Sequence, residues 1–187
     1  RRLALQHVDD LISMSDGQIW FDESLSDNGQ RPCMDPQRSI TRVGIGADTE
    51  SRADAPAIRR IVEGLRLDLA QAASMEGADV ATKASIQQIR KAKALLLAMH
   101  QPSSMGGRSL SESCTVILAA SRGYLDDAVD GGKMAGTAEG DALIKEMLQY
   151  VRKEAAGPLT TIDETLDMTD EVQSDIEGVL EAFFGKE

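Results

Sequence analysis

The stretch "ADAPAIRRIVEGLRLDLAQAASM", residues 53–75, decides the fold class. Pro56 suits the first position of a helix, because the nitrogen of proline carries no hydrogen that the helix would need. The apolar residues that follow recur at spacings of three and four, the period of one helix face: Ile58, Ile61, Val62, Leu65 and Leu69. The spacing predicts a helix where a turn-rich N-terminal part gives way to a helical remainder.

The same period recurs toward the C-terminus, at about residues 82–99, 111–127, 139–158 and 170–184. Gly157-Pro158 is expected to end the third of these helices, and Thr161 to Glu164 has the spacing of a capping box that starts a further turn. Amphipathic helices must bury their apolar stripes against one another. Residues 56–187 are therefore predicted to form a helical bundle domain.

The N-terminal part, residues 1–55, has a different pattern. Two apolar runs, Leu11–Met14 and Ile19–Phe21, flank an Asp16-Gly17 turn signal, which predicts two short strands joined tightly. The stretch at 24–39 is rich in Ser, Asp, Asn, Gly and Pro and is predicted to be a loop. Because two strands alone are not stable in water, we expect them to be the edge of a sheet whose other strands lie elsewhere.

Composition limits the classes of function. The chain has 187 residues, 42% of them hydrophobic and only 3% aromatic, so its core must consist of aliphatic side chains. Of the net charge of −11, residues 138–187 carry −9, with 13 acidic and 4 basic side chains. This sign disfavours nucleic acid as a partner. No apolar run approaches the roughly 20 residues of a membrane-spanning helix, so no direct membrane span is expected.

Motifs for independent catalysis are missing from the sequence. It has no G-x-x-x-x-G-K-[ST] phosphate loop, and "GIGADTES" lacks the lysine that such a loop needs. Cys33 and Cys114 have no CxxC spacing and are expected to be free thiols. With only His7 and His100 besides, no metal site is expected. Composition and spacing alone predict a strand-edged helical fragment without an active site.

Three stretches of sequence nevertheless carry a family resemblance: "LISMSDGQIWFDESLSDNGQRPCMDPQRSITRVG" (11–44), "GLRLDLAQ" (64–71) and "VILAASRGYLDD" (116–127). In order and spacing they resemble the α subunit of the rotary F-type ATP synthase. The resemblance implies that residues 1–55 are the end of a RecA-like α/β nucleotide-binding domain, completed by another chain, and that 56–187 are the C-terminal helical domain. It further implies an α subunit in two pieces, or a fragment of one.

The resemblance also implies roles for single residues. Arg42 matches the family's arginine finger, which reaches into the catalytic site of a neighbouring β subunit; an ordinary salt bridge is the alternative for this arginine. Ser13 matches a serine near the same phosphate site, and a strand serine bonded to backbone is an equal alternative. A guanidinium suits this role because its planar fork pairs with the charge that develops on a transferring phosphoryl group.

A second nucleotide site is implied on the α subunit itself. Arg31 and Pro32 match the pair beside the adenine of the non-catalytic nucleotide, and Gln101 matches the second of two glutamines there. Met99 stands where the first glutamine would be, so one polar contact is expected to be missing. The implied cofactor is ATP or ADP with Mg²⁺, the metal being held by groups outside this chain.

The implied partners are an N-terminal piece of the α subunit, the β subunits and the γ central stalk, assembled as an α3β3 hexamer. Divergence from the family pattern favours the matrix face of the mitochondrial inner membrane over a bacterial or plastid location. Two other functions stay open. The chain could be a purely structural assembly module in which Arg42 has no catalytic part, or an unrelated helical binding module.

Overall fold

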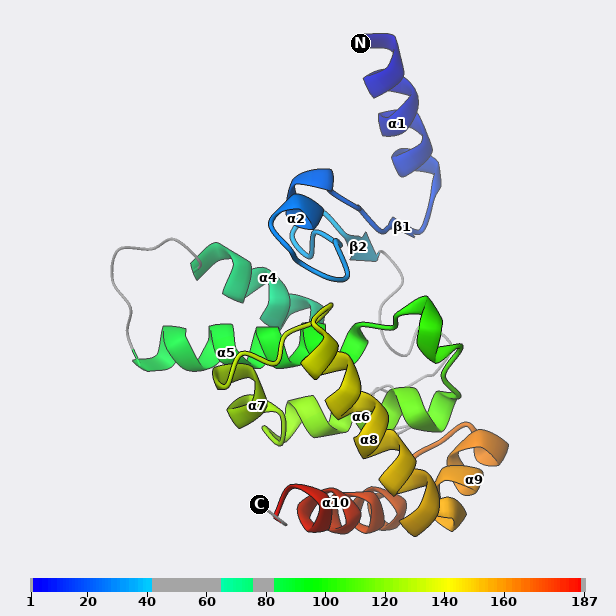
Figure 1. Ribbon diagram of the computed structural model, residues 1–187. Coiled ribbons are helices and arrows are strands. Elements are labelled where there is room, and N and C mark those ends of the chain that lie inside the picture. Colours follow the sequence, from blue (N-terminus) through cyan, green and yellow to red (C-terminus); the bar gives the residue numbers. More distant parts are fainter. Residues whose placement is uncertain (1, 42–64, 76–82, 186–187) are drawn as a thin grey trace.

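The structure is a computed structural model that describes residues 2–41, 65–75 and 83–185. These residues are mainly helical and contain one two-stranded antiparallel sheet, which confirms the predicted fold class. In Figure 1 the first helix, α1 (Arg2–Met14), projects from a small N-terminal part. A larger helical body lies below it and ends in α10 (Asp170–Phe184).

In the N-terminal part, the short sheet brings residues 17–18 and 40–41 together. Strand β1 (Gly17–Gln18) pairs antiparallel with β2 (Ile40–Thr41), with Gly17 opposite Thr41. Helix α2 (Glu23–Asp27) and a long loop lie between the two strands. A side chain at Gly17 would place its Cβ 2.5 Å from the carbonyl oxygen of Ile40, so this pairing requires glycine.

The predicted pair of strands at 11–14 and 19–21 is wrong. Leu11–Met14 forms the last turn of α1, since Val8, Leu11 and Ile12 follow a spacing of three and four rather than an alternation. Phe21 makes only an isolated bridge with Met34. The Asp16-Gly17 pair does not join two neighbouring strands, because β1 finds its partner more than twenty residues later in the chain.

The helical body contains α4 (Leu65–Met75), α5 (Lys83–Met99), α6 (Leu110–Ser121), α7 (Asp126–Asp130), α8 (Ala138–Glu154), α9 (Ala156–Thr165) and α10, with a 3₁₀ turn, η2 (Ser103–Met105). The helices predicted at 82–99 and 170–184 are confirmed. The predicted helix at 111–127 is divided into α6 and α7, because Gly123 adopts a left-handed backbone (φ 84°) that ends α6. The start of the first predicted helix, at Pro56, lies outside the described residues.

Two boundary predictions near α9 are wrong. Gly157-Pro158 does not end a helix: α8 ends at Glu154, and Pro158 lies in the first turn of α9, where a proline costs no hydrogen bond. Thr161 to Glu164 starts no helix either, since Thr161 is inside α9 and its hydroxyl donates to the carbonyl of Gly157. A capping box is instead formed by Ser109 with Glu112, at the start of α6.

Helix α5 lies at the centre of the core. Ala94, Leu95, Leu97 and Ala98 are fully buried, and α5 packs against α4, α6, α7 and α8. Arg108 closes the C-terminal end of α5 by donating from Nη1 to the carbonyl of Ala98 and from Nη2 to that of His100. Arg108 is partly buried there, and its burial lowers the pKa of its guanidinium.

The predicted domain boundary at residue 55 lies outside the described residues. Within the three described ranges, no helix is both long and apolar enough to cross a membrane.

Candidate functional site

The loop between α2 and β2 carries two of the predicted site residues, Arg31 and Pro32. The peptide bond between them is cis. Gln30 supports the turn by donating from Nε2 to the carbonyls of Pro32 (3.2 Å) and Met34 (3.0 Å). Arg31 donates from Nη1 to the carbonyls of Ser26 and Gln30, both at 2.8 Å. The loop therefore has an internally bonded backbone that holds Arg31 at its surface.

Ser39 anchors the approach to β2. It is only 4% exposed, and its Oγ accepts from the backbone nitrogen of Trp20 (2.9 Å) while donating to the carbonyl of Asp35 (2.6 Å). Arg38 stacks over the Trp20 ring, 3.6 Å from its centroid, and pairs with Asp22 at 3.7 Å. The segment that leads to Thr41 is thus held by side chains as well as by β1.

Asp22 begins α2 by accepting hydrogen bonds from the backbone nitrogen and hydroxyl of Ser24. These bonds, and to a smaller extent the charge of Arg38, lower the pKa of Asp22, so the carboxylate stays ionised beside the guanidinium. This pairing belongs to the support of the loop rather than to a catalytic acid or base.

The predicted catalytic residues are not brought together by the described part of the chain. Arg42 follows β2 directly but lies outside the described residues. Ser13 lies on α1 instead of a strand, is exposed, and donates from Oγ to the carbonyl of Asp10 at 2.7 Å. Both assignments therefore remain predictions.

The predicted nucleotide contacts are also separate. Gln101 is exposed just after α5, and its Nε2 lies 3.5 Å from the carbonyl of Gly106. Among the described residues, no hydrogen bond joins Gln101 to Arg31 or Pro32. The alkyl stem of Arg31 faces Gly136, on the connection between α7 and α8: a Cβ added there would lie 3.1 Å from Cγ of Arg31.

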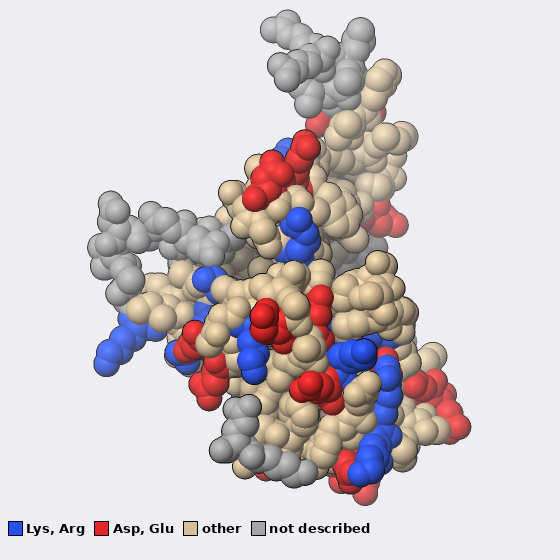
Figure 2. Space-filling model, in the orientation of Figure 1, with Lys and Arg blue, Asp and Glu red and all other residues tan. Residues whose placement is uncertain are grey.

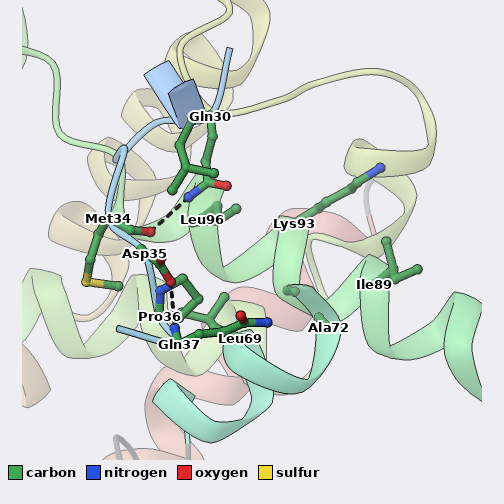
Figure 3. Close-up of a pocket in the computed structure, with 12 residues that line it drawn as sticks. Gln30, Met34, Asp35, Pro36, Gln37, Leu69, Ala72, Ile89, Lys93 and Leu96 are labelled. Atoms are coloured by element: carbon green, nitrogen blue, oxygen red, sulfur yellow. Dashed lines mark hydrogen bonds between the residues drawn. The ribbon is translucent and has the colours of Figure 1, made fainter. Parts of the chain in front are cut away.

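The loop and the helical body enclose two neighbouring cavities, of about 330 and 420 Å³. Figure 3 shows the smaller one, with the loop residues Gln30 to Gln37 on one side and residues of α4 and α5 on the other. Gln37 ties the two sides together, since its Nε2 donates to Oγ of Ser74 on α4 at 3.0 Å. Sequence reasoning missed these cavities, because no motif marks residues that converge from α2, the loop, α4, α5 and the connection between α7 and α8.

The helical body carries charges of both signs, and some of them form ion pairs. Figure 2 shows acidic and basic side chains interspersed on the visible face. Ion pairs join α5 to neighbouring helices through Arg90 with Asp130 and Lys91 with Asp68. In the described ranges no three His, Cys, Asp or Glu side chains gather at metal-binding distance.

Comparison with known proteins gives relatives for almost the whole chain. Over 92% of its length it is 32% identical to ATP synthase subunit alpha of Halorhodospira halophila and 30% identical to that of Petrotoga mobilis. Over 94% of its length it is 31% identical to the alpha subunit of Thioalkalivibrio sulfidiphilus. This chain is a relative of the ATP synthase alpha subunit. The resemblance seen in the sequence motifs is confirmed, although no protein-family model matches the chain.

The alpha-subunit relatives are much longer than this chain, which spans 32% of the length of these three. They are named as subunits of ATP synthase, a multisubunit enzyme.

The expected mitochondrial location is wrong. These three relatives and five further alpha subunits, matched at 28–31% identity, all come from bacteria, which points to a bacterial rather than a mitochondrial protein. Divergence from a family pattern shows how far a sequence has drifted, and it carries no information on compartment.

Proposed function

We propose that this chain acts as the C-terminal part of an ATP synthase alpha subunit and donates Arg42 to the catalytic site of a neighbouring beta subunit. The observation that carries the proposal is the match of 92% of the chain to alpha subunits at 30–32% identity, together with "SITRVG" at residues 39–44. The chain contains no phosphate loop of its own, so its catalytic part is a contribution to another subunit's site.

The described residues support this role because they hold the end of β2, which directly precedes Arg42 in the sequence. Thr41 pairs with Gly17, and the buried Ser39 is bonded both to Trp20 and to Asp35. A finger residue must keep its guanidinium where charge develops on the phosphoryl group, and a firmly held strand end serves that purpose. Such arginines contribute about 10³–10⁵ to the rate in other nucleotide hydrolases.

The proposal extends to a non-catalytic nucleotide site formed by Arg31, Pro32 and Gln101 around an adenine ring. The phosphates and Mg²⁺ would be held by residues outside this chain. The proposed partners are the N-terminal part of the alpha subunit, beta subunits and the gamma stalk in an α3β3 assembly.

The test compares Arg42→Ala and Arg42→Lys in the assembled complex, with Arg122→Lys as the control. Arg122 is a half-exposed arginine that pairs with Glu177, away from β2. We expect both Arg42 variants to assemble normally and to lose about 10³-fold or more in ATP turnover, because lysine keeps the charge but not the planar fork. The Arg122 variant should keep its turnover.

Native mass spectrometry of each complex checks assembly, and steady-state ATP hydrolysis checks catalysis. Turnover close to that of the unmodified complex in both Arg42 variants would refute the finger and leave the chain a structural module. Failure to co-purify with beta subunits would remove the assembly role as well.

A further inference from the structure

The two cavities beside the loop form one continuous cleft. They share four lining residues, Leu25, Gln30, Lys93 and Leu96, and so meet along helix α5. We call this space the α5 cleft. Its two lobes, of about 330 and 420 Å³, are each of the size of a small-molecule site.

The smaller lobe of the α5 cleft is mostly apolar. The side chains that line it come from α2, the loop, α4 and α5, and the apolar ones among them are Leu25, Met34, Pro36, Leu69, Ala72, Ile89, Ala92 and Leu96. Its one carboxylate, Asp35, is already engaged, since its Oδ1 accepts from the backbone nitrogens of Gln37 (2.8 Å) and Arg38 (3.1 Å). In Figure 3 the loop and the two helices face each other across this lobe.

The larger lobe is cationic. Arg31 and Lys93 line it, and none of its lining residues is acidic. Neither cation forms an ion pair with a carboxylate of the described residues, although the chain as a whole carries a net charge of −11. Arg31 directs only Nη1 to protein carbonyls. Two cations that line one lobe, without an acidic partner among the described residues, are electrostatically complementary to an anionic ligand.

We propose that the α5 cleft binds an amphipathic anion, with its carboxylate or phosphate between Arg31 and Lys93 and its apolar body in the smaller lobe. The apolar body gains by leaving water, and the anionic end gains charge-assisted hydrogen bonds from the two cations. Lys93 lines both lobes and therefore sits where the head of the ligand meets its tail.

This site overlaps the proposed nucleotide site at Arg31 but does not rest on it. Neither Pro32 nor Gln101 lines either lobe. Arg31 is common to both, so variants of Arg31 do not distinguish the two sites. Lys93 lines the cleft and is not part of the proposed nucleotide site, so it is the residue to change.

The test is calorimetric titration of the full chain with decanoate and with decyl phosphate, both below their micelle-forming concentrations. Decanol has the same tail without the charge. We expect both anions to bind about tenfold or more tightly than decanol, the factor expected for a hydrogen bond to a charged group. Lys93→Met should weaken anion binding by a similar factor and leave decanol binding unchanged.

Lys83→Met is the matched control. Lys83 begins the same helix, is exposed, and lies about 15 Å from Lys93 along the axis at 1.5 Å per residue. A second variant, Ala135→Phe, places a ring in the larger lobe without removing a charge and should abolish binding of the anions. Circular dichroism confirms that each variant keeps its helix content.

Four outcomes would overturn the proposal. If neither decanoate nor decyl phosphate binds, the α5 cleft is not an anion-binding site. If the Lys93 and Lys83 variants bind decanoate equally tightly, Lys93 does not contact the anion. If decanol binds as tightly as decanoate, the cleft makes no favourable contact with the anionic group. Unchanged decanoate binding by the folded Ala135 variant shows that the anion binds elsewhere.

Discussion

At the scale of single residues, the two cysteines illustrate what burial does to chemistry. Cys114 lies on α6 and is only 4% exposed, and burial, aided by the negative charge of Asp163, raises its pKa to about 11. Cys33 lies half-buried on the loop. The sequence predicted two free thiols, and both are free in the structure. Only the fold predicts that their reactivities differ, because thiols react as thiolates and burial opposes ionisation of Cys114.

We therefore expect a thiol-specific reagent at pH 8 to label Cys33 within the folded chain and to label Cys114 only after unfolding. A raised pKa also means that the unfolded state releases its proton first, so the contribution of Cys114 to stability is present below about pH 9 and is lost as the pH rises toward 11. Mass spectrometry of chains labelled with and without denaturant checks the labelling prediction. Equal labelling of both thiols in the folded chain would contradict it.

At the scale of elements, two helical glycines have opposite environments. Gly140 lies in the first turn of α8, where an added Cβ would clash with the carbonyl oxygen of Met134. That carbonyl accepts from the nitrogen and hydroxyl of Thr137, the residue that caps α8. Gly178 lies inside α10 with nothing within 4 Å of its added Cβ. The sequence does not distinguish them.

Gly140→Ala should lower the free energy of unfolding by about 1–3 kcal/mol, because the turn at Met134 must open to admit the methyl group. Gly178→Ala, its matched control, should raise that free energy by about 0.5–1 kcal/mol, because alanine loses less backbone freedom in a helix. Denaturant titrations of both variants measure the difference. A loss of stability in both variants, or in neither, would show that the turn at Met134 does not determine the effect of a side chain at position 140.

Elements also show where the sequence pattern is a good predictor. The helix predicted at about 170–184 agrees with α10 because its apolar stripe, Val172, Ile176 and Leu180, is regular, and the structure adds Thr169 as the residue that caps its start. The N-terminal strands were predicted wrongly because strand pairing is non-local: nothing near Gly17 indicates that its partner is Thr41.

At the scale of the whole molecule, stability is unevenly distributed. The helices α5, α6 and α8 contribute most of the fully buried side chains. The N-terminal part has two-residue strands and exposed large apolar side chains on and after α1, among them Leu11, Met14, Ile19 and Phe21. Buried apolar contacts determine the free energy of local opening, so the two parts should open independently.

Backbone amides at 94–98 and 116–120 should therefore exchange with deuterium about a hundredfold more slowly, or more, than those at 8–14. Hydrogen exchange followed by mass spectrometry of the full chain tests this. Similar protection in both regions would mean that α1 is held as firmly as the core.

The sequence by itself determined the helical class, the periods of the helices at 82–99 and 170–184, and the kinship with alpha subunits, because these depend on local spacing and on motifs read in order. Tertiary structure alone decided the partner of β1, the division of α6 from α7, and the α5 cleft. Those features require residues distant in sequence to meet, and the energy of such meetings lies in packing that no local pattern contains. Arg42 remains a prediction from the motif, and its test lies in the assembled complex.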